Sequence, residues 1–354
     1  MADRRKRLKQ IAGIVVSVAI VVAIFAYAIP KFADYGDVWE AFSSLTPLEL
    51  WSLVAVMVFN LLTYWLANMA ALPGLRLWPA AVVTQTTTSI ANTLPGGGAI
   101  AIGLTYTILR SWGFTGTDVA LYVGVTGIWN IFTKLSLPVL SIAVLAIVGG
   151  SSAAYVVAAV VGVGVLAVAV AMLAGVFASE RLARRVGDRL GAVASFLTRL
   201  VRRAPVADGG DRAIRFRRDT IGLVRHRWIR LTATTVLSHL ALYLVLLLSL
   251  RHMGVSEHEL GAAEVFAVFA FSRLLSALPL TPGGAGIIDL GYIGGLVAFA
   301  GEADRAAIVA AVLLFRVLTY GIQIPLGGFT YVIWRGRSSW RRQPAGDAAL
   351  AEAG

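Results

Sequence analysis

Long apolar stretches separated by short polar ones recur along almost the whole chain. A helix that crosses a membrane needs about 20 consecutive, mostly apolar residues. Six stretches reach that length and predict six full crossings: 11–29, 48–72, 119–148, 153–178, 229–251 and 305–334. The pattern therefore predicts an all-α polytopic membrane protein.

Two further apolar stretches are interrupted. Residues 79–110 are broken between Leu94 and Gly98, and residues 263–300 are broken at Pro279 to Gly284. Proline removes a backbone donor, and broken backbone is tolerated at membrane depth only inside protein or beside a wet cavity. We therefore expect two broken or re-entrant helical segments, giving about eight membrane segments. Each is either a re-entrant hairpin or two short crossings.

The order of elements repeats. Residues 1–150 contain span, span, broken segment and span, and residues 151–335 repeat that order. Three full crossings per half place the second repeat upside down relative to the first, a feature of transporters. The breaks also match locally, because Leu94-Pro-Gly-Gly-Gly-Ala-Ile100 resembles Thr281-Pro-Gly-Gly-Ala-Gly-Ile287. We expect two inverted membrane repeats.

Composition supports the membrane class. Hydrophobic residues make up 58% of the 354 residues and charged ones 14%, against about 25% charged in typical soluble domains. This excludes a soluble enzyme, and the formal charge of +12 indicates membrane orientation rather than a nucleic-acid partner. The absence of cysteine excludes thiol catalysis and disulfides.

Basic residues predict the orientation. They cluster at residues 4–7, in 179–230 with 14 arginines, and in the tail at 335–342. Since cytoplasmic segments carry excess Lys and Arg, we expect both termini in the cytoplasm and the protein in the inner (plasma) membrane. The remaining loops, 31–47, 251–262 and 301–304, are acidic and face outward on this reading.

Three segments outside the spans have alternative readings. Residues 179–228 are expected to form two amphipathic helices on anionic lipid, hinged at 204–210, or else a solvated loop. Residues 336–354 are expected to be a disordered cytoplasmic tail. Residues 1–29 resemble a signal peptide at Ala26-Tyr-Ala28, although their apolar run is longer than usual.

Four charged residues fall within predicted membrane segments: Lys134, Arg273, Asp289 and Arg316. A charge at membrane depth costs about 2.5–3.5 kcal/mol on insertion scales and indicates a functional site. Pairing of Asp289 with one arginine leaves two positive charges, which an anionic headgroup such as a phosphate would balance. Helices starting after the two breaks would direct free N–H groups at the same anion. The expected first-half and neutral binding residues are Asn92, Thr93, Pro95, Gly96, Gly97, Gly98, Thr281 and Tyr320.

The segment Pro279-Leu-Thr-Pro-Gly-Gly-Ala-Gly-Ile-Ile-Asp289, followed by Leu313-Leu-Phe-Arg316, resembles the flippase-like integral membrane domain of lysylphosphatidylglycerol synthases. The resemblance covers about residues 8–335. It implies that the motif positions bind the substrate: Pro279, Pro282, Gly283, Gly284, Gly286, Asp289 and Arg316. Asp289 replaces the usual Glu, and the first break lacks the charges that many members carry.

We expect no aminoacyl-transferring synthase domain, so the resemblance implies movement of a lipid between leaflets. The expected partners are an anionic phospholipid or a polyprenyl-phosphate-linked lipid, with a homodimer or a partner enzyme also open. No cofactor, metal or nucleic acid is expected. The alternatives are a secondary transporter of a soluble anion, a lipid-modifying membrane enzyme, or an accessory subunit of one.

Overall fold

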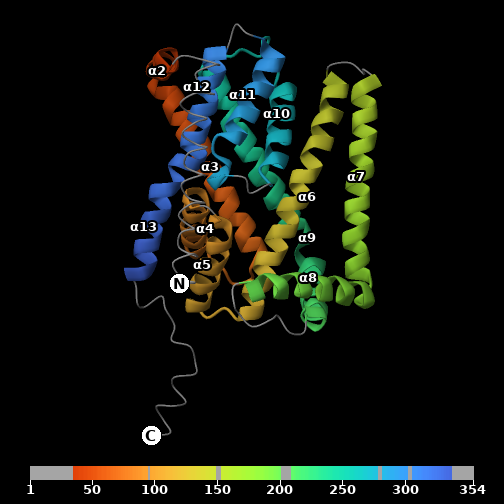
Figure 1. Cartoon of the computed structure of the whole chain (residues 1–354). Helices are drawn as coiled ribbons and strands as arrows, with labels where there is room; N and C mark the ends of the chain where they lie inside the picture. Colours follow the sequence, from red (N-terminus) through yellow and green to blue (C-terminus); the bar gives the residue numbers. More distant parts are fainter. Residues whose placement is uncertain are drawn as a thin grey trace.

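A computed structural model describes residues 35–94, 96–148, 153–200, 209–277, 281–301 and 305–336. All regular elements in these ranges are helical (Figure 1). In chain order they are α2 (Tyr35–Ser43), α3 (Pro47–Ala71), α4 (Leu77–Thr93), α5 (Gly97–Ser111), α6 (Gly116–Val148), α7 (Ala153–Ala178), α8 (Glu180–Leu200), α9 (Gly209–His252), α10 (Ala262–Leu275), η3 (Pro282–Gly284), α11 (Ile287–Ala300), α12 (Arg305–Arg316), η4 (Val317–Gly321) and α13 (Gln323–Gly336). The predicted all-α class is confirmed.

Four of the predicted spans match helical stretches long and apolar enough to cross a membrane. These stretches, found among the described residues, are Pro47–Ala71, Gly116–Val148, Ala213–His252 and Arg305–Gly336. The predicted span 153–178 coincides with the 26-residue helix α7. The predicted span 11–29 and nearly all of the predicted tail lie outside the described residues.

Both predicted breaks are present. α4 ends at Thr93 and α5 begins at Gly97, and the two helices pack against each other as a hairpin. α10 ends at Leu275 and α11 begins at Ile287, again packed together. The four arms have 17, 15, 14 and 14 residues, so each is about 21–25 Å long. Each arm is therefore shorter than the roughly 30 Å apolar core of a bilayer.

The two hairpins approach the middle of the molecule from opposite ends (Figure 1). One end, the α2 end, also holds the α9–α10 connection and the start of α12. The other, the α8 end, holds the α5–α6 connection and the end of α13. α4 contacts η3, so the broken tips of the two hairpins meet.

Each hairpin has its own hydrophobic core. Near the α2 end, α9, α10, α11 and α12 bury large side chains such as Phe269, Ile293 and Phe315. Near the α8 end, α4, α5 and α6 bury a second cluster that includes Val82 and Leu109. The tips lie between these two clusters, which leaves the centre of the molecule to polar groups.

The arginine-rich segment differs in part from expectation. α8 runs crosswise to the other helices at the end of the bundle that is named after it, as an amphipathic surface helix would (Figure 1). The expected second amphipathic helix is not separate, because α9 runs unbroken for 44 residues from Gly209 through the predicted span. At 1.5 Å per residue α9 is about 66 Å long, so it extends well beyond a bilayer core. Arg217 on that extension donates to the Phe177 carbonyl at 2.8 Å and so joins α9 to the end of α7.

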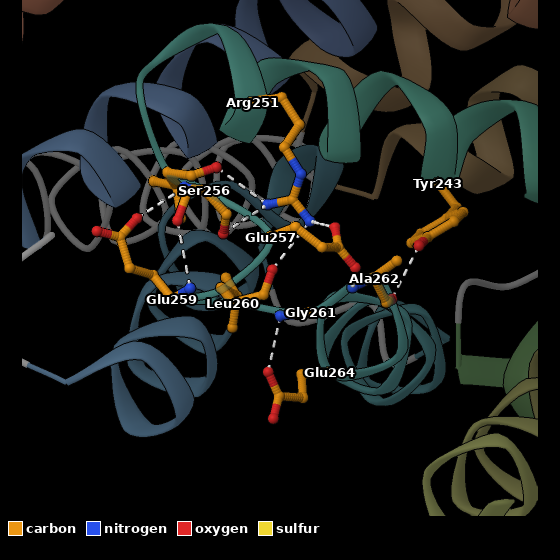
Figure 2. A network of polar contacts seen from close by, with 10 residues as sticks. Tyr243, Arg251, Ser256, Glu257, Glu259, Leu260, Gly261, Ala262 and Glu264 are labelled. Carbon is orange, nitrogen blue, oxygen red and sulfur yellow. Dashed lines mark hydrogen bonds and ion pairs between the residues drawn. The ribbon is translucent and has the colours of Figure 1, made fainter. Parts of the chain in front are cut away.

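A polar network fixes the connection from α9 to α10 (Figure 2). Arg251 pairs with Glu257 and donates to three backbone carbonyls at 2.9–3.2 Å, those of Val255, Ser256 and Leu260. Glu257 also accepts from the Ala262 N–H at 2.8 Å, and Tyr243 donates to the Ala262 carbonyl at 2.8 Å. The backbone hydrogen bond from Ala262 and the pairing with Arg251 lower the pKa of Glu257. The start of the second hairpin is therefore held by charged hydrogen bonds.

Candidate functional site

A cavity of about 520 Å³ lies where the two hairpin tips meet. Its wall includes Gly96, Gly97 and Gly98 of the first break and Gly283 and Gly284 of the second. Helices α3, α6, α9 and α10 and the segment from η4 to α13 complete it. The structure thus brings together two segments that are almost 190 residues apart in the chain.

Two cationic side chains line the cavity. Lys134 comes from α6, and Arg273 comes from α10 with only 8% of its surface exposed. Among the described lining residues none is Asp or Glu, and no described acid forms an ion pair with Lys134 or Arg273. The Nε of Arg273 is buried and makes no hydrogen bond within the described part of the chain. The cavity therefore has a positive wall with unused hydrogen-bond donors.

Asp289 pairs with Arg316, one of the two arginines that the sequence left open as its partner. The Arg316 Nε lies 2.5 Å from Asp289 Oδ1, as an ion pair without the alignment of a hydrogen bond. Asp289 is 1% exposed, and its other oxygen accepts from the Gly286 N–H at 2.7 Å. Arg316 also donates to the Gly283 carbonyl at 3.1 Å. Arg316 thus ties α12 to η3 through the Gly283 carbonyl and to the first turn of α11 through Asp289.

Tyr320 connects this pair to the cavity. Its ring lines the cavity, and the Arg316 guanidinium carbon lies 3.7 Å from the ring centroid. Tyr320 belongs to η4, a single π-helical turn that begins directly after Arg316, and such turns are frequent at functional sites. Arg316 is not itself a lining residue. The guanidinium of Arg316 instead contacts the second tip, so the expected direct contact of Arg316 with a ligand stays a prediction.

The helix starts at the two breaks also differ from expectation. The start of α11 is capped, because Asp289 accepts from Gly286 and places a negative charge in the first turn. The start of α5 follows Gly96, a left-handed glycine at φ 68°, and has no side-chain cap. Of the two breaks, the first therefore presents an uncapped helix start to the cavity.

The contact between the tips depends on a second glycine with positive φ. Gly283 has φ 58°, and a Cβ built on it would lie 3.3 Å from Asn92 and from the Tyr320 ring. Asn92 and Thr281 line the cavity, whereas Thr93 is exposed and lies outside the wall. Pro95 and Pro279 fall outside the described residues, and Pro282 begins η3.

Sequence reasoning missed much of the polar wall. The cavity is also lined by the carboxamides of Gln85, Asn130 and Gln323 and by the hydroxyl of Tyr64. Gln85 is 1% exposed, and the carboxamide oxygens of Gln85 and Asn130 accept no hydrogen bond from the described residues. A signal was present, because carboxamides inside long apolar stretches are unusual and commonly face a bundle interior.

These features define a polytopic helical membrane protein whose two broken hairpins enclose a basic, polar cavity. The chain matches the family model described as the lysylphosphatidylglycerol synthase TM region over residues 11–327, and it belongs to this family. Membership makes it a membrane protein related to lipid modification or translocation. A search of curated proteins finds no match.

Proposed function

We propose that this protein moves an anionic lipid headgroup between the leaflets of a membrane, with the central cavity as its binding site. The observation that carries the proposal is the pair Lys134 and Arg273 on a cavity wall that has no acid among its described residues. Uncompensated charges at membrane depth are costly, so a bound anion stabilises the wall as well as the ligand.

The paired hairpins support an alternating mechanism. We interpret the two as re-entrant halves of an inverted repeat, since their arms are shorter than a bilayer core and their tips meet. Rocking of one half against the other would then expose the cavity to each leaflet in turn. Gly283 and Asn92 lie at the contact that such a motion has to separate.

A lipid fits the surroundings of the cavity better than a soluble anion does. Leu94, Gly96 and Gly98 line the cavity and are also exposed. From there α5 continues with exposed apolar side chains, including Ile100 at 49% and Ile102 at 54%. A headgroup entering beside α5 could reach the polar wall while its acyl chains stay against an apolar surface.

Transport in proteoliposomes tests the site. Fluorescent phosphatidylglycerol labelled on its acyl chain is followed as a membrane-impermeant reductant quenches the outer leaflet. We expect Lys134→Met and Arg273→Met to slow translocation by about tenfold or more, with partial recovery in Lys134→Arg. The matched control is Arg230→Met, which removes an exposed cation outside the cavity. Parental rates in both cavity variants would overturn the site.

Two further measurements address the alternative and the orientation. Uptake of labelled inorganic phosphate into the same vesicles, with no lipid movement, would favour a soluble anion. We also propose that the α8 end faces the cytoplasm, because α8 and the arginine-rich first turns of α9 lie there. The chain has no cysteine, so Ser256→Cys and Thr115→Cys place single thiols at opposite ends for labelling in intact cells. If only Thr115→Cys were labelled from outside the cell, the proposed orientation would be wrong.

A further inference from the structure

The cavity wall carries more neutral hydrogen-bonding groups than a phosphate can use. Four carboxamides line it, those of Gln85, Asn92, Asn130 and Gln323, together with hydroxyls such as that of Ser276. We infer that the ligand is a phosphate ester of a polyol or sugar, and that headgroups carrying an amine are selected against. This inference rests on the proposed function, since it names the headgroup class for the same cavity.

The phosphate part follows from the cations. Lys134 and Arg273 offer only donors, and a phosphate diester offers only acceptors. An ammonium group placed in the same cavity would be repelled by both cations. The described wall has no carboxylate to offset that repulsion. The charge pattern therefore favours a headgroup that is anionic throughout over a zwitterionic or cationic one.

The polyol part follows from the carboxamides. The oxygens of Gln85 and Asn130 accept no hydrogen bond from the described residues, and a buried acceptor without a donor is costly. A phosphate diester has no hydrogen to give them. The hydroxyls of a polyol can both donate to a carboxamide oxygen and accept from its NH₂ group. Such a headgroup uses acceptors that a bare phosphate leaves unpaired.

The helices place the two kinds of group side by side. Asn130 and Lys134 are four residues apart on α6, so both project from one face of that helix. Gln85 and Asn92 are two turns apart on α4 and line the same cavity. A phosphate held near Lys134 would thus have carboxamides within reach of the next group along the headgroup.

Rates for four acyl-labelled lipids test the inference in the parent protein. Phosphatidylinositol and phosphatidylglycerol carry a polyol, phosphatidic acid carries the phosphate alone, and phosphatidylethanolamine carries an amine. We expect the two polyol lipids to move on the order of tenfold faster than the other two. Phosphatidylethanolamine or phosphatidic acid moving as fast as phosphatidylinositol would overturn the inference while leaving lipid transport intact.

Variants assign the preference to the carboxamides. We expect Gln85→Leu and Asn130→Leu each to lower the ratio of phosphatidylinositol to phosphatidic acid rates, while Arg230→Met keeps the parental ratio. Two variants are used so that the test still works if one of them does not fold. An unchanged ratio in both folded leucine variants would refute the role of the carboxamides.

Binding separates this inference from the proposed function. If no lipid moves, the proposed function fails, but thermal unfolding with soluble esters still ranks headgroups. Inositol phosphate and glycerol 3-phosphate raising the unfolding temperature more than phosphoethanolamine and inorganic phosphate would support the inferred chemistry in a soluble ligand. Equal shifts from all four would refute it.

Discussion

The two broken hairpins share a sequence pattern but differ in what holds their tips. At the first tip, α5 starts after Gly96 without a side-chain cap, and three glycines line the cavity. At the second, Asp289 caps the start of α11 and pairs with Arg316. The same Pro-Gly-Gly break therefore produces one open helix start and one that is electrostatically closed.

Because of this difference, we expect the two tips to have different roles. The positive end of α11 is offset by Asp289, whereas the positive end of α5 remains available to an anion in the cavity. At the second tip, Arg316 also donates a hydrogen bond to the Gly283 carbonyl, which holds the backbone in place. We regard the second tip as the rigid support and the first as the ligand-facing surface.

Removing the acid of the second tip should have the largest effect. Asp289→Ala leaves Arg316 buried without its partner, and breaking a buried pair costs roughly 3–5 kcal/mol in free energy of unfolding. Chemical unfolding in detergent measures the loss. The control is Asp118→Ala, which removes a carboxylate that accepts from Thr115 at the start of α6 and should cost about 1 kcal/mol. Equal losses in the two variants would show that the second tip is not an electrostatic lock.

A double substitution sharpens that result. Asp289→Ala combined with Arg316→Met removes both charges and should recover part of the loss, because a buried unpaired charge is the main cost. A double variant less stable than Asp289→Ala alone would instead assign the stability to the Arg316 contacts with Gly283 and Tyr320.

At the first tip, the effect of a substitution on stability should depend on available space rather than on charge. A Cβ on Gly97 would lie 2.3 Å from the Ile90 carbonyl oxygen, so Gly97→Ala should cost about 1–3 kcal/mol by forcing α4 and α5 apart. The neighbouring Gly98→Ala meets nothing within 4 Å and should be neutral or slightly stabilising. Thermal unfolding of the two purified variants measures the contrast, and similar midpoints would contradict the close packing of the hairpin.

The sequence predicted the helical class, the breaks and most of the long spans, because apolar run length and Pro-Gly interruptions are local signals. It also offered Arg273 and Arg316 as possible partners of Asp289, and the choice of Arg316 depends on how α12 packs against the second break. The inverted repeat remains a prediction. The direct ligand role of Arg316 also stays a prediction, because the fold places Tyr320 at the wall with Arg316 packed against it.

The polar wall was harder to predict. Gln85, Asn130 and Gln323 are single polar residues in three different apolar stretches, and nothing local shows that they share one cavity. The unbroken α9 was also missed, since the loose apolar spacing before Trp228 resembles a separate surface helix. In both cases the deciding contacts are between segments far apart in the chain.

The left-handed glycines allow a direct comparison of the tips. Gly96 has φ 68°, and a Cβ built on it has nothing within 4 Å. Gly96→Ala should therefore lower the free energy of unfolding only through added backbone strain, by about 1 kcal/mol. Gly283→Ala should lose more, because its Cβ would also crowd Asn92 and Tyr320 at 3.3 Å. Unfolding free energies and transport rates are measured together. Equal losses at the two positions would show that the tips are not in contact.

The smallest effect concerns how the second hairpin starts. Glu257 accepts from Ala262 and pairs with Arg251, and both interactions lower its pKa from the ordinary 4.5. A carboxyl whose pKa is lower in the folded state contributes stability above its unfolded pKa and loses it as pH falls through the folded value. We therefore expect the unfolding temperature of Glu257→Gln to lie below that of the parent at neutral pH, and the gap to close below about pH 4.5.

The first hairpin provides the control for this pH dependence. α4 starts at Leu77, and the side chain of the preceding residue Arg76 makes no capping hydrogen bond, so Arg76→Gln should shift the unfolding temperature by an amount that does not change across the same pH range. Glu257 is exposed on the surface, which keeps its contribution small because water screens the pair. A gap between the parent and Glu257→Gln that persists unchanged in acid would mean that the two proteins differ in packing alone. The charged hydrogen bonds that distinguish the start of the second hairpin would then contribute nothing to its stability.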